Sequence, residues 1–251
     1  MSQQFETILI LGATSGIGEA FARRYHAQGK KVIAAGRRLN RLEALKAELK
    51  GLEIFQSLES NFNQLLKQFP TLDTVFMLSG VLSQFWFKDP STSTNEDIIN
   101  EVAVNTTAPI LAARLLIPHL LSLNRPAAFL LITSGMAFIP IPLYPVYCPT
   151  KAAIHSFAIT LRGQLEGTNV SVIELAPPYV DTALDAKSRG KDGNPMPPMP
   201  LDEFMDSAMK GLEETENGKP KKEVAVGFAE TGVSTWRGAF GPILKNFGIE
   251  K

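Results

Sequence analysis

The chain predicts an α/β fold in which one doubly wound parallel sheet of about seven strands carries helices on both faces. Short apolar segments of β type alternate with amphipathic helical segments along the 251 residues, which is the order of repeated βαβ units. The β-type segments are continuously apolar, as strands are when both faces of a sheet are covered. Because βαβ crossovers are right-handed, a doubly wound sheet is the expected arrangement. Residues 1–251 are therefore expected to form a single domain.

The strands are expected where apolar and β-branched residues run together between turn residues. In chain order these segments are Thr7–Leu11, Val32–Ala35, Glu53–Gln56, Thr74–Leu78, Ala127–Ile132, Val170–Leu175 and Glu223–Phe228. The third segment is the weakest of them, because it is short and half polar.

The helices are expected where apolar residues recur at helical spacing. The first helix ends at Gly29, where a left-handed cap is needed. In the second helix Asn40 and Glu43 have the spacing of a capping box. The expected helices are about Ile17–Gln28, Leu39–Leu49, Asn61–Phe69, Asn95–Ser122 and Pro149–Glu166.

One segment, residues 187–200 (KSRGKDGNPMPPMP), has no periodicity and is rich in Gly, Pro and charge. Long loops in compact domains are usually lids, binding loops or disordered segments. This one follows the sixth strand, at the end of the sheet where doubly wound folds bind ligands. We therefore expect a substrate-binding loop there, mobile without ligand and ordered over the substrate.

The composition argues against several classes of protein. There are 25 basic and 25 acidic residues, so neither nucleic acid nor an anionic membrane is an expected partner. The only cysteine, Cys148, fits a reducing compartment and a small structural thiol, and without a signal sequence the expected location is the cytoplasm. The apolar segment 108–123 is interrupted by Arg114, Pro118 and His119, which favours a long buried helix over a membrane span.

The turn after the first strand has the sequence GATSGIG and is a candidate phosphate-binding turn. Glycine allows a tight turn and a close approach of the backbone to a pyrophosphate, and the following helix offers free N–H groups. The placement of the motif predicts a Rossmann-type dinucleotide site; the alternative is a packing turn with no ligand. The expected cofactor-binding residues are Gly12, Thr14, Ser15, Gly16, Ile17 and Gly18.

Arg37 and Arg38 follow the second strand after Gly36. Sites for NAD usually place an acidic residue here to hold the ribose hydroxyls. An arginine fork can instead pair with a 2′-phosphate, so NADP(H) is the expected cofactor. The alternative is a pair of solvated arginines.

Tyr147 and Lys151 are four residues apart, with Pro149 in the expected first helical turn between them. The two side chains should share one face of that helix. An ammonium beside a phenol is expected to lower the pKa of the tyrosine and make it a usable general acid or base. Ser134 ends the fifth strand, where its hydroxyl can hydrogen-bond a substrate carbonyl or its developing oxyanion.

These motifs resemble the short-chain dehydrogenase/reductase family over about residues 5–185. The resemblance rests on the glycine turn, Asn105, Ser134 and the Tyr147-x-x-x-Lys151 pair. Within the family, the chain resembles the DltE-type branch more closely. The resemblance implies that Tyr147 is the proton donor or acceptor, that Lys151 holds the nicotinamide ribose, that Ser134 positions the substrate oxygen and that Asn105 holds a water in the proton relay. It further assigns to the cofactor site Ser79, Gly80, Asn105, Tyr147, Lys151, Pro177, Val180 and Thr182.

The sequence departs from the family pattern at three places, and none of them removes a catalytic group. Leu11 stands where the family usually has Thr before the first glycine. Residues 77–80 read Met-Leu-Ser-Gly in place of Asn-Asn-Ala-Gly, and Pro177-Pro178 replaces Pro-Gly.

The predicted function is an NADP(H)-dependent carbonyl reductase or alcohol dehydrogenase, expected to be a homodimer or homotetramer. The alternatives are an NADP-binding redox sensor without turnover and an enzyme acting on a nucleotide sugar. No metal site is expected, because His26, His119 and His155 are scattered. Four residues near the site either line an apolar substrate pocket or pack in the core: Met136, Phe138, Tyr144 and Tyr179.

Overall fold

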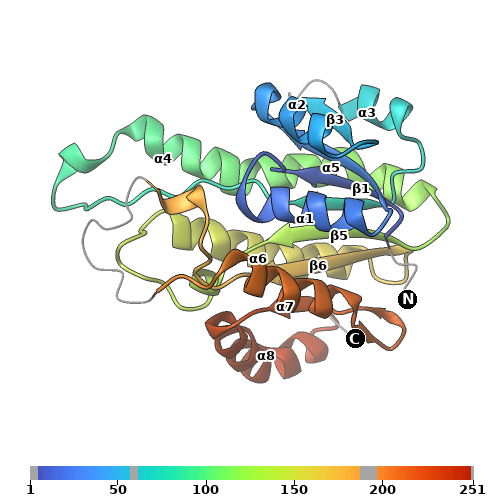
Figure 1. Cartoon of the computed structure of the whole chain (residues 1–251). Helices are drawn as coiled ribbons and strands as arrows, with labels where there is room; N and C mark the ends of the chain where they lie inside the picture. Colours follow the sequence, from blue (N-terminus) through green and yellow to red (C-terminus); the bar gives the residue numbers. More distant parts are fainter. Residues whose placement is uncertain (1–4, 57–61, 187–196, 250–251) are drawn as a thin grey trace.

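The computed structural model describes residues 5–56, 62–186 and 197–249. Its centre is a seven-stranded parallel sheet, as predicted, in the order β3-β2-β1-β4-β5-β6-β9 (Figure 1). The order reverses between β1 and β4, so the two crossovers there leave in opposite directions. The strands are β1 Thr7–Leu11, β2 Lys31–Gly36, β3 Glu53–Gln56, β4 Thr74–Met77, β5 Ala127–Ile132, β6 Val170–Ala176 and β9 Glu223–Ala225.

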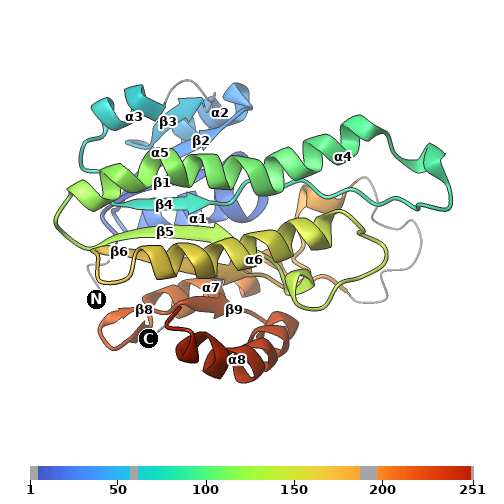
Figure 2. The same ribbon diagram turned by 180° about the vertical axis from the view of Figure 1, so that it is seen from behind.

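Helices cover both faces of this sheet, and each face has its own apolar core. Side chains of α1, α2 and α7 pack on one face, and side chains of α3, α5 and α6 pack on the other (Figure 2). The α8 helix packs near β9 and the loop after β5. The helices are α1 Gly16–Ala27, α2 Leu39–Glu48, α3 Phe62–Gln68, α4 Asn95–Val102, α5 Ala108–Ser122, α6 Tyr147–Gln164, α7 Leu201–Glu213 and α8 Phe228–Asn246.

Three local predictions need correction. The Asn40–Glu43 capping box is wrong, because α2 already begins at Leu39 and has no side-chain cap at its start. The last strand of the sheet stops at Ala225, since Gly227 adopts a left-handed φ of 61° and opens α8. The structure also adds a small hairpin, β7 Thr215–Glu216 and β8 Lys219–Pro220.

The predicted Asn95–Ser122 helix forms as one continuous helical rod, the α4–α5 rod, whose regular α-helical geometry is interrupted near its middle. Thr94 and Asp97 form a capping box at its start. A π-helical turn, Ala103–Thr107, then joins α4 to α5, and such turns often mark functional sites. By length and composition alone this rod could cross a membrane, a test that core helices also pass. Its α5 part packs on the sheet through Ala112, Ala113, Leu116, Ile117 and Leu120.

The predicted substrate-binding loop falls largely outside the described residues. Residues 187–196 are not described, and only 197–200 of the segment remain. Of these, Met199 continues the chain into a short parallel bridge with Val180. The expectation of a mobile substrate-binding loop therefore stays a prediction.

Candidate active site

The glycine turn after β1 lies against the loop that follows β4. Gly12 has a left-handed φ of 100°, and a Cβ atom built there would lie 2.7 Å from the Ser79 nitrogen. A Cβ on Gly18 would lie 2.4 Å from the Gly12 carbonyl oxygen. Neither position can carry a side chain without moving the backbone. The turn is thus as tight as predicted, and it leads directly into the N-terminus of α1 at Gly16.

A cluster of arginines faces this turn. The Arg38 guanidinium donates to Thr14 Oγ1 at 2.6 Å and to Ser15 Oγ at 2.8 Å. Arg41, which the sequence analysis did not include, donates to the Thr14 carbonyl at 3.4 Å. Burial, then the charges of Arg41 and Arg37, lower the pKa of Arg38. Two guanidinium groups bonded to a turn that leads into a helix N-terminus make a site that favours an anion, and the charge of Arg37 acts on one of them.

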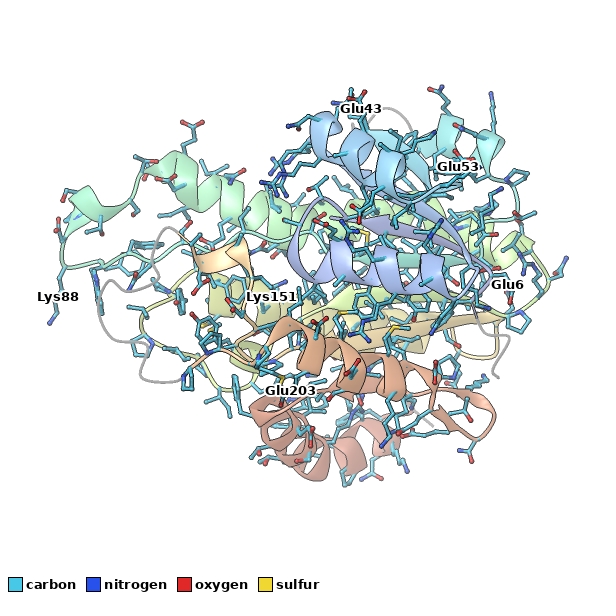
Figure 3. All side chains as sticks on the ribbon, in the orientation of Figure 1. Glu6, Glu43, Glu53, Lys88, Lys151 and Glu203 are labelled. Carbon is cyan, nitrogen blue, oxygen red and sulfur yellow. The ribbon has the colours of Figure 1, made fainter. Side chains whose placement is uncertain are left out.

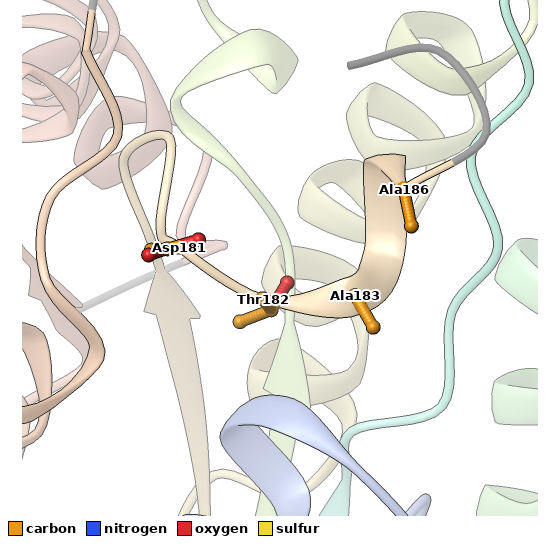
Figure 4. Close-up of a pocket in the computed structure, with 4 residues that line it drawn as sticks. All are labelled: Asp181, Thr182, Ala183 and Ala186. Carbon is orange, nitrogen blue, oxygen red and sulfur yellow. The ribbon is translucent and has the colours of Figure 1, made fainter.

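The segment after β6 also contacts the glycine turn, in addition to the loop after β4 and the arginines. A Cβ on Gly16 would lie 3.3 Å from the Thr182 side chain, so these two residues are in close contact. The Pro177 carbonyl accepts from Gly135 N at 2.9 Å, and Val180 is buried. An open cavity of about 540 Å³ lies here, as Figure 4 shows. Its lining residues are Asp181, Thr182, Ala183 and Ala186.

The predicted Ser–Tyr–Lys group is brought together at the carboxyl edge of β5. Tyr147 is the first residue of α6, and Lys151 lies one turn later with only 2% of its surface exposed. Ser134 Oγ accepts from Met136 N at 3.1 Å, and a Ser134 hydrogen bond reaches the Tyr147 side chain. Lys151 Nζ donates to the Ile132 carbonyl at 3.1 Å and lies 5.4 Å from the Tyr147 ring centroid. Figure 3 shows Lys151 in the interior, whereas Lys88 lies at the periphery.

The pKa of Tyr147 does not follow the sequence-based expectation. Burial raises it above the ordinary value, and the Ser134 hydrogen bond opposes only part of that rise. The Lys151 ammonium, which donates to the Ile132 carbonyl, does not offset that rise. Burial in turn lowers the pKa of Lys151 to about 8, against the opposing charge of Glu101. The expectation of a lowered pKa for Tyr147 is therefore wrong.

Asn105 lies on the π-helical turn and is fully engaged in hydrogen bonds. Its Nδ2 donates to the Val81 carbonyl at 2.8 Å and to Thr150 Oγ1 at 3.2 Å, and its Oδ1 accepts from Val81 N at 2.9 Å. A Cβ on Gly80 would lie 3.7 Å from Asn105 Oδ1 and 3.9 Å from Lys151 Nζ. Gly80, Asn105 and Lys151 therefore meet at one point, although the polar groups of the Asn105 side chain hold the Val81 backbone.

The four residues left open in the sequence divide between the site and the core. Met136 and Tyr144 form an apolar cluster with Tyr147, Cys148, Leu82 and Leu143. Phe138 instead contacts the His155 ring, with centroids 4.5 Å apart. The Tyr179 hydroxyl donates to Asp185. Cys148 is buried, and its Sγ accepts a hydrogen bond from Ile141 N, in agreement with a structural thiol.

The three histidines have structural partners. Nε2 of His26 and of His119 lies near the Lys50 and Leu72 carbonyls, respectively, and His155 Nδ1 lies 2.9 Å from Glu174 Oε2. Within the described ranges, no group of His, Cys, Asp and Glu side chains could hold a metal ion.

Comparison with known proteins agrees with this geometry. The family model described as short chain dehydrogenase matches residues 6–193. The chain is 38% identical to "Uncharacterized oxidoreductase DltE" of Bacillus subtilis (strain 168), over 85% of this chain and 87% of that protein. It is 31% identical to "NADP-dependent 3-hydroxy acid dehydrogenase YdfG" of Salmonella typhi, over 69% and 72%. A solved structure, the closed form of serine dehydrogenase complexed with NADP+, superposes with a TM-score of 0.76 at 26% identity, covering 88% and 94%.

The fold, the glycine turn and the buried Ser–Tyr–Lys group together define a hydride-transferring oxidoreductase of CH–OH and C=O groups that uses a nicotinamide cofactor. The chain belongs to the short-chain dehydrogenase/reductase family, as its motifs predicted.

Proposed function

We propose that the protein is an NADP(H)-dependent carbonyl reductase or alcohol dehydrogenase that uses Tyr147 as its general acid and base. The observation that carries the proposal is the burial of Tyr147, Ser134 and Lys151 at one point beside Gly80. Relatives whose names include NADP, and the NADP+ complex of serine dehydrogenase, support the choice of cofactor.

The residues of the site fit a phosphorylated dinucleotide. Gly12 and Gly18 leave the backbone free of side chains where a pyrophosphate would lie. Arg38, with Arg37 and Arg41 close enough to lower its pKa, offers the charge for a 2′-phosphate. The cavity lies beside Thr182, and Gly80 presents no side chain next to Lys151.

When bound, the reduced nicotinamide supplies a hydride to a carbonyl carbon. The Tyr147 hydroxyl donates the proton that the oxygen needs. Ser134, already hydrogen-bonded to Tyr147, donates to the same oxygen as its negative charge develops. Lys151 holds its ammonium near the phenol ring and returns a proton to the phenolate. In the oxidation of an alcohol these proton movements run in reverse.

The direct test is the substitution Tyr147→Phe. The phenyl ring keeps most of the packing, so the fold and NADPH binding should persist. Turnover of NADPH with a panel of ketones and aldehydes should fall by about 10²–10⁴-fold, which is the range for a general acid.

The comparison variant is Tyr144→Phe, which removes a buried hydroxyl three residues away that has no lysine four positions later. Its loss of turnover should be far smaller. If Tyr147→Phe kept near-normal rates while Tyr144→Phe lost them, Tyr144 would be the acid. A protein that binds NADPH but turns over no carbonyl compound would instead support the redox-sensor alternative. In either case we propose a cytoplasmic protein.

A further inference from the structure

One buried carboxyl near the site has no role in the mechanism above. Glu101, in the last turn of α4, is 0% exposed. Its Oε1 accepts a long hydrogen bond from Ser83 N at 3.4 Å. Its Oε2 is buried and, among the described residues, has no hydrogen-bond partner. An ionised carboxylate in that position is costly unless a proton or a partner neutralises it.

The carboxyl faces the same groups that the mechanism uses. Glu101 lies four residues before Asn105, and the rod that carries both packs against α6. Its charge acts on Lys151, Tyr147 and Cys148 of α6. From the loop after β4 the contacting group is Ser83, which carries no charge.

The acidity of the carboxyl matches that of the lysine. Burial raises the pKa of Glu101 to about 7, against the hydrogen bonds of Ser83 and the charge of Lys151. Burial lowers the pKa of Lys151 to about 8. Two groups with pKa values this close exchange a proton at little cost in either direction, and both lie near neutral pH.

We propose that Glu101 is the internal proton reservoir of the site, giving a proton to Lys151 during carbonyl reduction and taking one back during alcohol oxidation. This inference rests on the proposed function. Glu101 acts through Lys151 and Tyr147 without contacting the substrate, so it is a positioning residue for the proton and not a catalytic one.

The protons balance over one reduction. Tyr147 gives its hydroxyl proton to the substrate oxygen, and the phenolate takes one from the Lys151 ammonium. The neutral amine takes the carboxylic proton of Glu101, and solvent then restores that proton. No direct ion pair joins the two described side chains, so the transfer from Glu101 to Lys151 requires one bridging water molecule, which is how polar groups beyond hydrogen-bond reach are commonly connected.

The test uses Glu101→Gln, which keeps the shape of the side chain but cannot give up a proton. In the protein without cofactor, infrared difference spectra between pH 5 and pH 9 should show a carboxylic C=O band that titrates near pH 7. The Glu101→Gln variant should lack this band. This readout does not depend on turnover, so it tests the titrating carboxyl even if no carbonyl substrate is found.

Turnover gives the second readout. In the unmodified protein the kcat for reduction should fall as pH rises through about 7, because the reservoir then loses its proton. The Glu101→Gln variant should not show this fall of kcat with pH. Its kcat should be about 10-fold lower than that of the unmodified protein, with little change in KM. A loss of about 10-fold in kcat is below the range for a direct general acid. Imidazole in the buffer should restore its rate with increasing concentration and leave the unmodified rate unchanged.

The control is Glu96→Gln, an exposed position on the same helix, which should keep the infrared band, the fall of kcat with pH and the insensitivity to imidazole. If Glu101→Gln folds and keeps an unmodified pH profile without imidazole dependence, the reservoir is excluded. If that variant does not fold, Glu101→Met, which likewise has no carboxyl, takes its place, and the absence of an imidazole-dependent rate in it overturns the proposal.

Discussion

Arg38 places a positive charge directly against the glycine turn. It donates to Thr14 and Ser15, and the charges of Arg41 and Arg37 act on it. Arg38→Ala should weaken NADPH binding by about 10- to 100-fold, since a hydrogen bond to a charged group contributes about 1.5–3 kcal/mol and 1.4 kcal/mol is tenfold. NADH, which lacks the 2′-phosphate, should lose little. Calorimetric titration of both cofactors measures the difference.

The control for this substitution is Lys88→Ala, a cation at the periphery of the molecule (Figure 3), which should change neither affinity. Tighter binding of NADH than of NADPH by the unmodified protein would exclude the arginine site for a 2′-phosphate.

At the scale of single residues, the sequence could predict side chains whose spacing already gives their geometry. Tyr147 and Lys151 share a helix face at four-residue spacing, and Ser134 follows a strand, so the three could be placed from local rules. Glu101 could not, because Asn95–Val102 reads as an ordinary polar helix in which two more acidic residues are exposed. Its burial comes from the packing of α4 on α6, a tertiary contact. The raised pKa of Tyr147 has the same origin.

At the scale of elements, β6 carries a charge inside the sheet. Glu174 is fully buried; Thr133 Oγ1 donates to it at 2.8 Å, and the Arg162 guanidinium forms an ion pair with it at 3.7 Å. Burial alone would raise its pKa, but the hydrogen bonds of His155 and Thr133 and the charges of His155 and Arg162 hold it below the ordinary value. Arg162 also pairs with Glu223 on β9. The ion pairs therefore join β6, α6 and β9.

This network predicts a stability that depends on pH. A carboxyl whose pKa is lower in the folded chain stabilises above its unfolded value near 4.5 and loses that contribution on acidification. Glu174→Gln should leave Arg162 poorly compensated and cost about 3–5 kcal/mol at pH 7. Urea unfolding at pH 7, 5 and 3 measures this, and the difference between the two proteins should shrink at pH 3. A constant difference across that range would contradict the linkage.

The elements divide into those that local pattern determines and those that packing determines. The strands were predictable because most of them are continuous apolar segments between turns or helices; β3, which is half polar, is the exception. Tyr147 begins α6 two residues before the expected Pro149, since Pro is tolerated throughout a first helical turn. The α8 helix was missed because its sequence contains three glycines and Pro242, which are poor helix formers. Packing holds it: a Cβ on Gly232 would lie 2.8 Å from Phe138.

At the scale of the whole molecule, the α4–α5 rod presents an uncovered apolar face. At 1.5 Å per residue, its 28 residues span about 42 Å. Figure 2 shows α4 continuing beyond the sheet. One side of α5 packs on the sheet, and elsewhere the rod exposes large apolar side chains: Ile99 and Val102 on α4, and Ile110, Leu111 and Leu115 on α5. Exposed apolar patches of this kind usually mark interaction sites, and the expected homodimer or homotetramer would cover this one.

The last prediction follows from that face. Leu111→Glu should change the protein from an oligomer to a monomer, because a standard interface buries only about 800 Å² per partner and a charge at its apolar centre stays unpaired. The side chain is 40% exposed, so the fold itself should persist. Light scattering after size exclusion measures the mass of both proteins.

The matched control is Leu39→Glu on α2, a leucine that is 39% exposed away from the rod, and it should keep the oligomer. A monomeric unmodified protein, or an oligomer unaffected by Leu111→Glu, would contradict the interface. Flotation of the unmodified protein with lipid vesicles would assign the same face to a membrane.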